Sequence, residues 1–203
     1  MIKMPCLFVR EFNGHNKPVL TREVTPGCEW VLNGEGTASR KWDGTACAVL
    51  GGVLYKRLDA KCGKAAPVGA IPCQPLPDAT TGHWPHWVRV SADKPEDKWH
   101  VEAWFDGFGH TGSGFDNGTY ELCGPAIGAN AEGLTAHELI KHGDHPLELA
   151  PRDFVGLQVY LTENRIEGLV FLHPDGRRCK IRRDDFGLDW GNKSKDRSPL
   201  LRK

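Results

Sequence analysis

The stretch Arg40-Lys41-Trp42-Asp43-Gly44-Thr45 gives the first indication of how this chain folds. The residues up to Lys41 read as an extended strand, and Asp43-Gly44 is typical of a tight turn. Apolar residues resume at 46–50, so we predict a strand on each side of this turn. A lysine here can be a nucleophile if burial or neighbouring cations favour its neutral amine. A lysine beside a turn is more commonly a solvated surface residue, so the other motifs have to discriminate.

Two further turn signals predict β-hairpins. Gly51-Gly52 separates two apolar runs, so the strand after the lysine turn is expected to continue into a hairpin that returns Arg57 near Lys41. Pro174-Asp175-Gly176 separates 166–172 from 178–182 and predicts a second hairpin in the same way.

Three other segments carry local signals. Phe154, Leu157 and Leu161 have the spacing of an amphipathic helix. The pattern Thr135–Glu138 is that of a capping box and predicts a short helix that ends near residue 142. Residues 29–32 (EWVL) read as a strand.

Length and composition favour one soluble globular domain over 1–203. Hydrophobic residues make up 39% and charged residues 26% of the 203 positions, which suits a chain with a single sizeable core. No apolar run approaches the roughly 18 residues of a membrane span, and 1–5 do not begin a secretory signal. We therefore expect no membrane association and a cytoplasmic location.

The seven cysteines are odd in number and never spaced Cys-x-x-Cys, which indicates free thiols in a reducing compartment. One alternative stays open. A zinc site could be built from Cys62, Cys73, His83 and His86, although their spacing matches no established zinc pattern.

Charge is neutral in total but unevenly distributed. The basic C-terminal segment 177–203 holds ten Lys/Arg and four Asp/Glu, an excess of six positive charges on a chain of net charge zero. Such a segment is either a phosphate-contacting surface or a solvated tail.

The second hairpin also carries charged residues that suit a phosphate site. Strand alternation places Lys180 and Arg182 on one face, with Glu167 at the paired strand. Two cations and a carboxylate facing one cleft suit a polyphosphate with its divalent metal. The sequence has no Walker loop and no Gly-x-Gly-x-x-Gly after a strand, so if a nucleotide binds, attack by a lysine is more natural than a kinase or Rossmann binding mode. It also has no Gly-x-Ser-x-Gly elbow of the kind found in serine hydrolases.

Four motifs follow the lysine stretch in chain order. They are 56–59 (KRLD), 120–122 (YEL), 167–170 (EGLV) and 180–182 (KIR). The series resembles the motifs of the covalent nucleotidyltransferases, which include RNA ligases, DNA ligases and RNA capping enzymes, and it extends over about 34–186. The resemblance implies that Lys41 accepts AMP as the nucleophile. It places Asp43 in the catalytic set and Arg40 among the nucleotide-binding residues.

The resemblance also implies a role for each later motif. Arg57 would contact the ribose or the α-phosphate, and Glu121 the ribose. Glu167 belongs to the acidic motif near the metal, Mg²⁺ or Mn²⁺. Lys180 and Arg182 would contact the α-phosphate and take part in catalysis. The family has a second lysine where this chain has Arg182, which keeps the charge but not the shape.

Within the superfamily, the chain is most similar to small 5′–3′ RNA ligases related to the vertebrate ATP-dependent enzyme. Residues 57–61 (RLDAK), 120–125 (YELCGP) and 128–134 (GANAEGL) carry this likeness. It implies an α+β fold with an ATP-grasp-like nucleotidyltransferase core of antiparallel sheets flanked by helices, and ATP in the cleft between sheets. Only 23 residues follow Lys180, so we expect no OB domain.

The resemblance therefore implies an ATP-dependent RNA ligase that joins RNA 5′-phosphate and 3′-hydroxyl ends through a lysyl-AMP intermediate. Two alternatives stay open. One is a capping-type guanylyltransferase, which would use GTP. The other is a nucleotide- or RNA-binding protein that does not ligate and never forms a lysine adduct.

Overall fold

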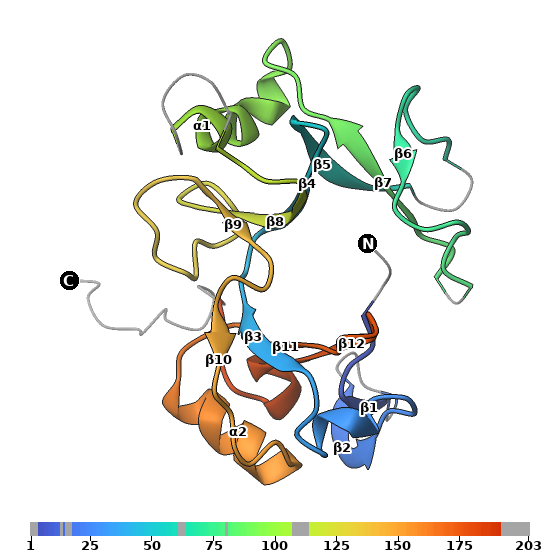
Figure 1. Ribbon diagram of the computed structural model, residues 1–203, viewed down its shortest axis with the longest axis vertical. Helices are drawn as coiled ribbons and strands as arrows, with labels where there is room; N and C mark the ends of the chain where they lie inside the picture. Colours follow the sequence, from blue (N-terminus) through green and yellow to red (C-terminus); the bar gives the residue numbers. More distant parts are fainter. Residues whose placement is uncertain are drawn as a thin grey trace, which may run out of the picture.

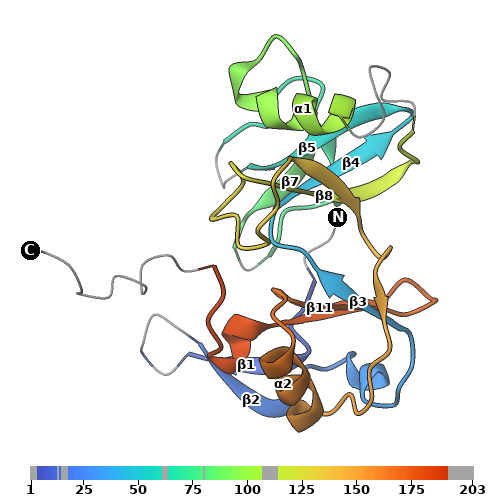
Figure 2. The same cartoon turned by 90° about the vertical axis from the view of Figure 1, so that its left-hand side faces the viewer.

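The computed structural model describes residues 4–12, 14, 18–60, 64–79, 81–106 and 114–191. Within them the strands form antiparallel sheets of six and four strands and a separate two-stranded pair. The two larger sheets follow one another along the long axis of the molecule (Figure 1). The helices α1 and α2 lie at opposite ends, with both sheets between them (Figure 2). This arrangement confirms the predicted α+β class, whereas the nucleotidyltransferase core remains a prediction.

The six-stranded lobe has the strand order β6-β7-β5-β4-β8-β9 and is covered by α1 (Lys98–Asp106), which follows the 3-10 turn η2 (Pro95–Asp97). Its strands are β4 (Thr45–Leu50), β5 (Val53–Ala60), β6 (Ile71–Pro72), β7 (Trp84–Arg89), β8 (Gly118–Cys123) and β9 (Glu138–Lys141). The predicted hairpin at Gly51-Gly52 is confirmed, and both glycines have a positive φ. Val49, Leu122 and Ala103 belong to one apolar core that joins sheet and helix.

The four-stranded lobe has the strand order β10-β3-β11-β12. Its strands are β3 (Thr37–Lys41), β10 (Pro146–Leu147), β11 (Gly168–Leu172) and β12 (Arg178–Arg182). The strand pair β1 (Phe8–Glu11) and β2 (Val19–Val24), the helix α2 (Phe154–Glu163) and the 3-10 turn η3 (Arg183–Phe186) complete the lobe. The predicted hairpin β11–β12 and the predicted helix are both confirmed. Leu157 and Leu161 of α2 are fully buried in the same core as Phe171 and Ile181.

The chain passes between the two lobes at two connections that touch each other. Residues 42–44 lead from β3 to β4, and residues 142–145 lead from β9 to β10. The rings of Trp42 and His145 pack edge to face, with centroids 5.2 Å apart, and the Arg40 N–H donates to the His145 carbonyl at 3.1 Å. Lys41 is thus the last residue of its strand, directly before a connection between the lobes.

The predicted helix that begins at Thr135 is wrong, because 138–141 form strand β9. Leu139 pairs with Leu122 of β8 and lies in the core of the six-stranded lobe. Cross-strand pairing and burial therefore override the local capping pattern.

The predicted strand at 29–32 is also wrong, because Glu29–Val31 form the 3-10 turn η1. The Glu29 carboxylate accepts from the Gly27 N–H at 2.9 Å, and the Trp30 indole N–H donates to the Gly27 carbonyl at 3.0 Å. These local side-chain hydrogen bonds favour a turn over a strand.

Candidate functional site

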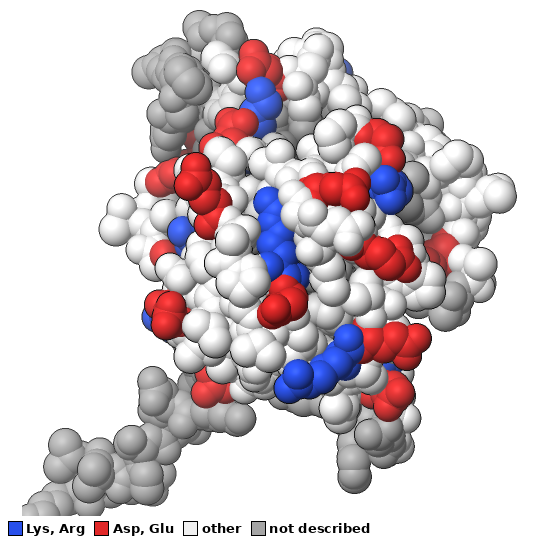
Figure 3. Space-filling view, turned by 60° about the horizontal axis from the view of Figure 1, so that its bottom comes forward, with Lys and Arg blue, Asp and Glu red and all other residues white. Residues whose placement is uncertain are grey.

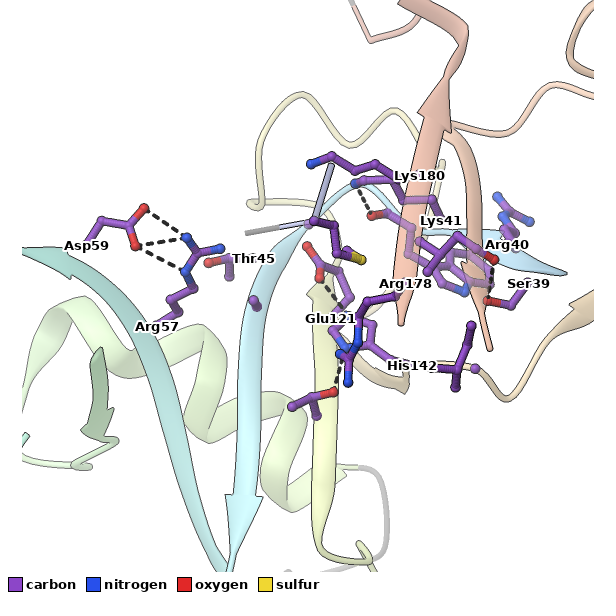
Figure 4. A pocket seen from close by; sticks show the side chains of 18 residues that line it. Ser39, Arg40, Lys41, Thr45, Arg57, Asp59, Glu121, His142, Arg178 and Lys180 are labelled. Atoms are coloured by element: carbon purple, nitrogen blue, oxygen red, sulfur yellow. Dashed lines mark hydrogen bonds and ion pairs between the residues drawn. The ribbon is translucent and has the colours of Figure 1, made fainter. Parts of the chain in front are cut away.

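A cavity of about 490 Å³ lies between the two lobes. Residues of β3, β11 and β12 line one side, and residues of β4, β5, β8 and the 142–143 connection line the other. Figure 4 shows the labelled side chains of both sides around this space. The predicted site residues that line the cavity are Arg40, Lys41, Arg57, Glu121 and Lys180. The predicted site residues outside this lining are Asp43, Glu167 and Arg182.

Lys41 is held at the cavity by a buried carboxylate. The pairing of Lys41 with Gly168 across β3 and β11 places Glu167 beside the lysine. The Lys41 Nζ donates a hydrogen bond to the Glu167 carboxylate, and it also lies 3.4 Å from the Trp42 carbonyl. Burial raises the pKa of the Glu167 carboxyl, and the Lys41 charge opposes this shift. The pair therefore joins a lysine amine to a carboxylate with an increased affinity for protons.

The neighbouring strand β12 contributes two cations to the same side of the cavity. Lys180 pairs with Val170, which pairs with Ser39, so Lys180 shares a sheet face with Ser39 and Lys41. Burial lowers the pKa of Lys180, and the charge of Lys41 acts in the same direction. Among the described residues, neither the Lys180 amine nor the exposed Arg178 guanidinium forms an ion pair or a side-chain hydrogen bond. Uncompensated positive charge at a cavity indicates an anion site.

Sequence reasoning missed Arg178, although the signal was available. Arg178, Lys180 and Arg182 alternate along β12 and therefore share a face. The structure brings the first two to the cavity, whereas Arg182 donates to Asp185 together with Arg10 of β1. The cavity thus has Arg178 beside Lys180, where the sequence had predicted Arg182.

The opposite side presents Glu121 in a short hydrogen-bond chain. The Nε2 atom of His142 lies 2.9 Å from the Glu121 carboxylate, and its Nδ1 atom lies 2.9 Å from the Thr119 hydroxyl. All three residues line the cavity. His142 and Thr119 were not predicted, and His142 lies at the end of the segment that was expected to be helical. Its alignment with β8 therefore had no signal in the local pattern.

Arg57 reaches the cavity from β5 and is fixed by a neighbour on its own strand. Its guanidinium forms two hydrogen bonds of 3.1 Å with the carboxylate of Asp59, which has the same orientation two residues further on. Figure 4 shows this pair on the side of the cavity away from Lys41 and Lys180. The prediction that Arg57 lies on the second strand of a hairpin is confirmed. The prediction that this strand returns it near Lys41 is not, because Arg57 does not contact Lys41.

Arg40, which lines the cavity, and Asp43, which does not, both have partners within the protein. The Arg40 guanidinium forms an ion pair with Glu132 and lies 3.8 Å from the centre of the Trp42 ring. The Asp43 carboxylate accepts from the Trp190 indole N–H at 3.0 Å. Both residues therefore have protein partners where the sequence had predicted nucleotide binding and catalysis.

The described residues contain no group of three or more His, Cys, Asp or Glu side chains that could hold a metal ion. Cys73, His83 and His86 thus form no zinc site by themselves, and Cys62 lies outside the described residues. His86 instead contacts the Trp84 carbonyl through its Nδ1 atom at 2.8 Å. Glu167 fits Mg²⁺ only as a single carboxylate, a mode in which substrate phosphates and water supply the other ligands.

Part of the basic segment 177–203 can be assigned partners. Arg177 pairs with Asp175, and Arg183 donates to the carbonyls of Leu161 and Asn164. The face seen in Figure 3 shows acidic and basic side chains interspersed, without a broad area of one sign. The five basic residues from Lys193 onward lie outside the described residues. In the part that the structure describes, the free positive charge of the segment is therefore at the cavity.

Comparison with known proteins places the chain near RNA ligases without assigning a family. No family model matches the sequence. The chain is 27% identical over 267 residues to "RNA ligase 1" of Rattus norvegicus, with 93% of this chain and 81% of the relative covered. The same values hold for "RNA ligase 1" of Mus musculus. The similarity is distant but extends over most of both chains.

None of the described helices is long and apolar enough to cross a membrane.

Proposed function

We propose that this chain is an ATP-dependent RNA ligase that joins RNA 5′-phosphate and 3′-hydroxyl ends through a lysyl-AMP intermediate. The observation that carries the proposal is the amine of Lys41 at the cavity, hydrogen-bonded to Glu167 and beside Lys180, which has no ion-pair partner among the described residues. A nucleophile, a proton acceptor and a phosphate-binding cation are the groups that nucleotidyl transfer to lysine requires. The similarity to RNA ligase 1 supports RNA as the substrate.

In the first step, the Lys41 ammonium transfers a proton to Glu167, and the neutral amine attacks the α-phosphorus of ATP. The new N–P bond forms as the bond from this phosphorus to the bridging oxygen breaks. Pyrophosphate leaves, and the nitrogen loses its second proton to solvent. Lys180 is placed on the same sheet face as Lys41, where it neutralises charge on the transferred phosphate.

In the next two steps, AMP passes to the RNA 5′-phosphate and is then displaced. An oxygen of the 5′-phosphate attacks the lysyl-AMP phosphorus and the N–P bond breaks. The Lys41 nitrogen then regains its two protons, one from Glu167 and one from solvent. The RNA 3′-hydroxyl then attacks the 5′-phosphorus of the adenylated end and gives its proton to solvent, AMP leaves, and a phosphodiester remains. Once its proton has returned to Lys41, the Glu167 carboxylate would hold a divalent cation together with the phosphates, and this cation would neutralise negative charge.

The remaining polar residues of the cavity suit the nucleoside. Glu121, oriented by His142, presents carboxylate oxygens that accept hydrogen bonds from ribose hydroxyls. Arg57 remains a proposed contact to the ribose or the α-phosphate at the far side. These roles are proposals that mutation of each residue can separate.

The proposal is tested with two 5′-phosphorylated substrates of one sequence, an RNA with a free 3′-hydroxyl and a nicked duplex DNA. Both are incubated at equal concentration with ATP and Mg²⁺. In a parallel reaction GTP replaces ATP, and the protein adduct formed with each nucleotide is measured. We expect RNA joining to exceed sealing of the DNA nick. Equal or faster sealing of the nick contradicts an RNA ligase. An adduct formed with GTP and not ATP indicates a capping-type enzyme, and no adduct with either nucleotide indicates a binding protein.

A further inference from the structure

We propose that Trp190 is a positioning residue for Lys41: its indole N–H holds Asp43 and thereby the turn that carries the nucleophile. The proposal rests on the proposed function, in which Lys41 attacks ATP. Asp43 was predicted to be catalytic, but its carboxylate is outside the cavity lining and faces Trp190. Its partner comes from 147 positions further along the chain, four residues after the end of the turn η3.

The turn after Lys41 is held from two directions. The Asp43 carboxylate accepts from Trp190, and the Asp43 backbone N–H donates to the Glu132 carboxylate at 2.9 Å. Glu132 also forms the ion pair with Arg40, and its side chain is 1% exposed. Trp190 is itself 8% exposed, so its hydrogen bond is partly shielded from water. The residues on both sides of Lys41 are therefore held by partly buried polar contacts.

These contacts join the two lobes at the nucleophile. Trp190 follows the last turn of the four-stranded lobe, whereas Glu132 lies between β8 and β9 of the six-stranded lobe. A Cβ added to Gly191 would lie 3.3 Å from the Ala131 side chain and 3.6 Å from the Asp43 carboxylate. The segment that carries Trp190 thus packs closely on both the turn and the neighbouring loop of the other lobe.

The position of the amine matters because nucleotidyl transfer needs it in line with the bond from the phosphorus to the leaving oxygen. A displacement of about 1 Å can reduce the rate about a hundredfold. Trp190 does not line the cavity, so its loss should reduce the rate of transfer and leave ATP binding intact. By the same reasoning, the rate of transfer should depend on the Asp43 oxygen that accepts from Trp190 and much less on the Asp43 charge.

The test compares Trp190→Phe with Trp30→Phe. Trp30 is a matched control because it is buried in the same lobe and also donates one indole hydrogen bond, to the Gly27 carbonyl. Single-turnover adduct formation is measured over a range of ATP concentrations, with the melting temperature of each variant. We expect Trp190→Phe to lower the maximal rate between about tenfold and a hundredfold, with the half-saturating ATP concentration within twofold. Trp30→Phe should change neither value.

Two variants of Asp43 separate a positioning role from a catalytic charge. Asp43→Asn keeps an acceptor oxygen and should retain most of the rate, whereas Asp43→Leu should fall to the level of Trp190→Phe. The double variant Asp43→Leu/Trp190→Phe should be no slower than either single variant, because both substitutions remove the same hydrogen bond. Independent losses that multiply in the double variant, or an Asp43→Asn variant as slow as Asp43→Leu, overturn the proposal.

A second measurement remains informative if the wild-type protein forms no adduct and the proposed function fails. Lysine acylation by an amine-reactive ester is followed by mass spectrometry in wild type and Trp190→Phe, without nucleotide. A held turn predicts faster modification of Lys41 in the variant and an unchanged rate at Lys56, which is paired with Asp97 in the six-stranded lobe. Equal Lys41 rates contradict the positioning role, whatever the activity of the protein.

Discussion

The amine of Lys41 donates a hydrogen bond to the carboxylate of Glu167, 126 positions further along the chain. The antiparallel pairing of β3 with β11 brings the two residues together at the edge of the cavity. Because burial raises the pKa of the Glu167 carboxyl, this group can receive the proton that Lys41 has to lose before it attacks. The sequence resemblance assigned Glu167 to the metal, and its contact with Lys41 adds the role of proton acceptor to the proposal.

Glu167→Gln should reduce the rate of lysine adenylation by about a hundredfold or more, because a positioned base contributes at least this factor. Glutamine keeps the shape and one acceptor oxygen but cannot take the proton. Part of the rate should return at high pH, where solvent can deprotonate the amine. The measurement is single-turnover adduct formation against pH, with the exposed Glu163→Gln as control. A Glu167→Gln variant as fast as wild type at neutral pH would exclude this role.

Arg178→Ala should raise the half-saturating ATP concentration about tenfold, which corresponds to about 1.4 kcal/mol of binding free energy. Arg178 has no ion-pair partner among the described residues and lines the cavity. Arg177→Ala removes the same charge from the adjacent position, but Arg177 is paired with Asp175 outside the cavity. We expect this control to stay within twofold of wild type. Equal effects of the two substitutions would indicate a general effect of net charge.

Local signals were sufficient for the hairpins and for α2, because each depends on residues within a few positions. Gly51-Gly52 supplies two positive φ angles, and the spacing of Phe154, Leu157 and Leu161 gives a buried helix face. The strand β9 could not be predicted in this way. Its capping pattern is helical, and only the distant strand β8 makes the extended form more stable.

The grouping of candidate residues at one cavity was predictable where chain order carried the information. Lys41, Glu121 and Lys180 line one cavity as expected. Asp43 and Arg182 show the limit, because each is paired with a residue that motif spacing cannot identify. Trp190 takes the Asp43 carboxylate, and Asp185 takes the Arg182 guanidinium.

Gly44→Ala should destabilise the fold by about 1–3 kcal/mol, the usual cost of overpacking a close contact. A Cβ at Gly44 would lie 2.8 Å from the Cys123 sulfur and would overlap the Leu122 carbonyl oxygen. Gly118→Ala is the matched control, because the nearest atom to its added Cβ is the Lys141 side chain at 3.7 Å. The free energy of unfolding is measured in urea for both variants. Similar stability of the two variants would contradict the close packing of Gly44 against β8.

His100 should make the protein less stable in mild acid. It is 8% exposed, and its two ring nitrogens have no hydrogen-bond partner among the described residues. Burial lowers its pKa, which the nearby Asp97 opposes and Lys56 reinforces. The unfolded chain then binds the proton more readily, so stability decreases as pH falls from about 6.5, the value for unfolded histidine, to the lower folded pKa.

The measurement for His100 is the melting temperature of wild type and His100→Gln between pH 7.5 and 5.5. Glutamine cannot take up a proton in this range, so the variant should lose less stability over the interval than wild type. Other ionisable groups contribute equally to both proteins and cancel in the comparison. A wild-type protein whose melting temperature falls no more steeply than that of the variant would contradict a buried neutral His100.

The intact mass of the protein after incubation with ATP and Mg²⁺ tests the central claim most directly. We predict a mass increase of one AMP, located on Lys41 by peptide mapping and absent from Lys41→Ala. Lys41→Arg keeps the charge beside Glu167 and should also form no adduct. An adduct of wild-type yield in Lys41→Ala, or one located on Lys56, would show that the nucleophile is not Lys41.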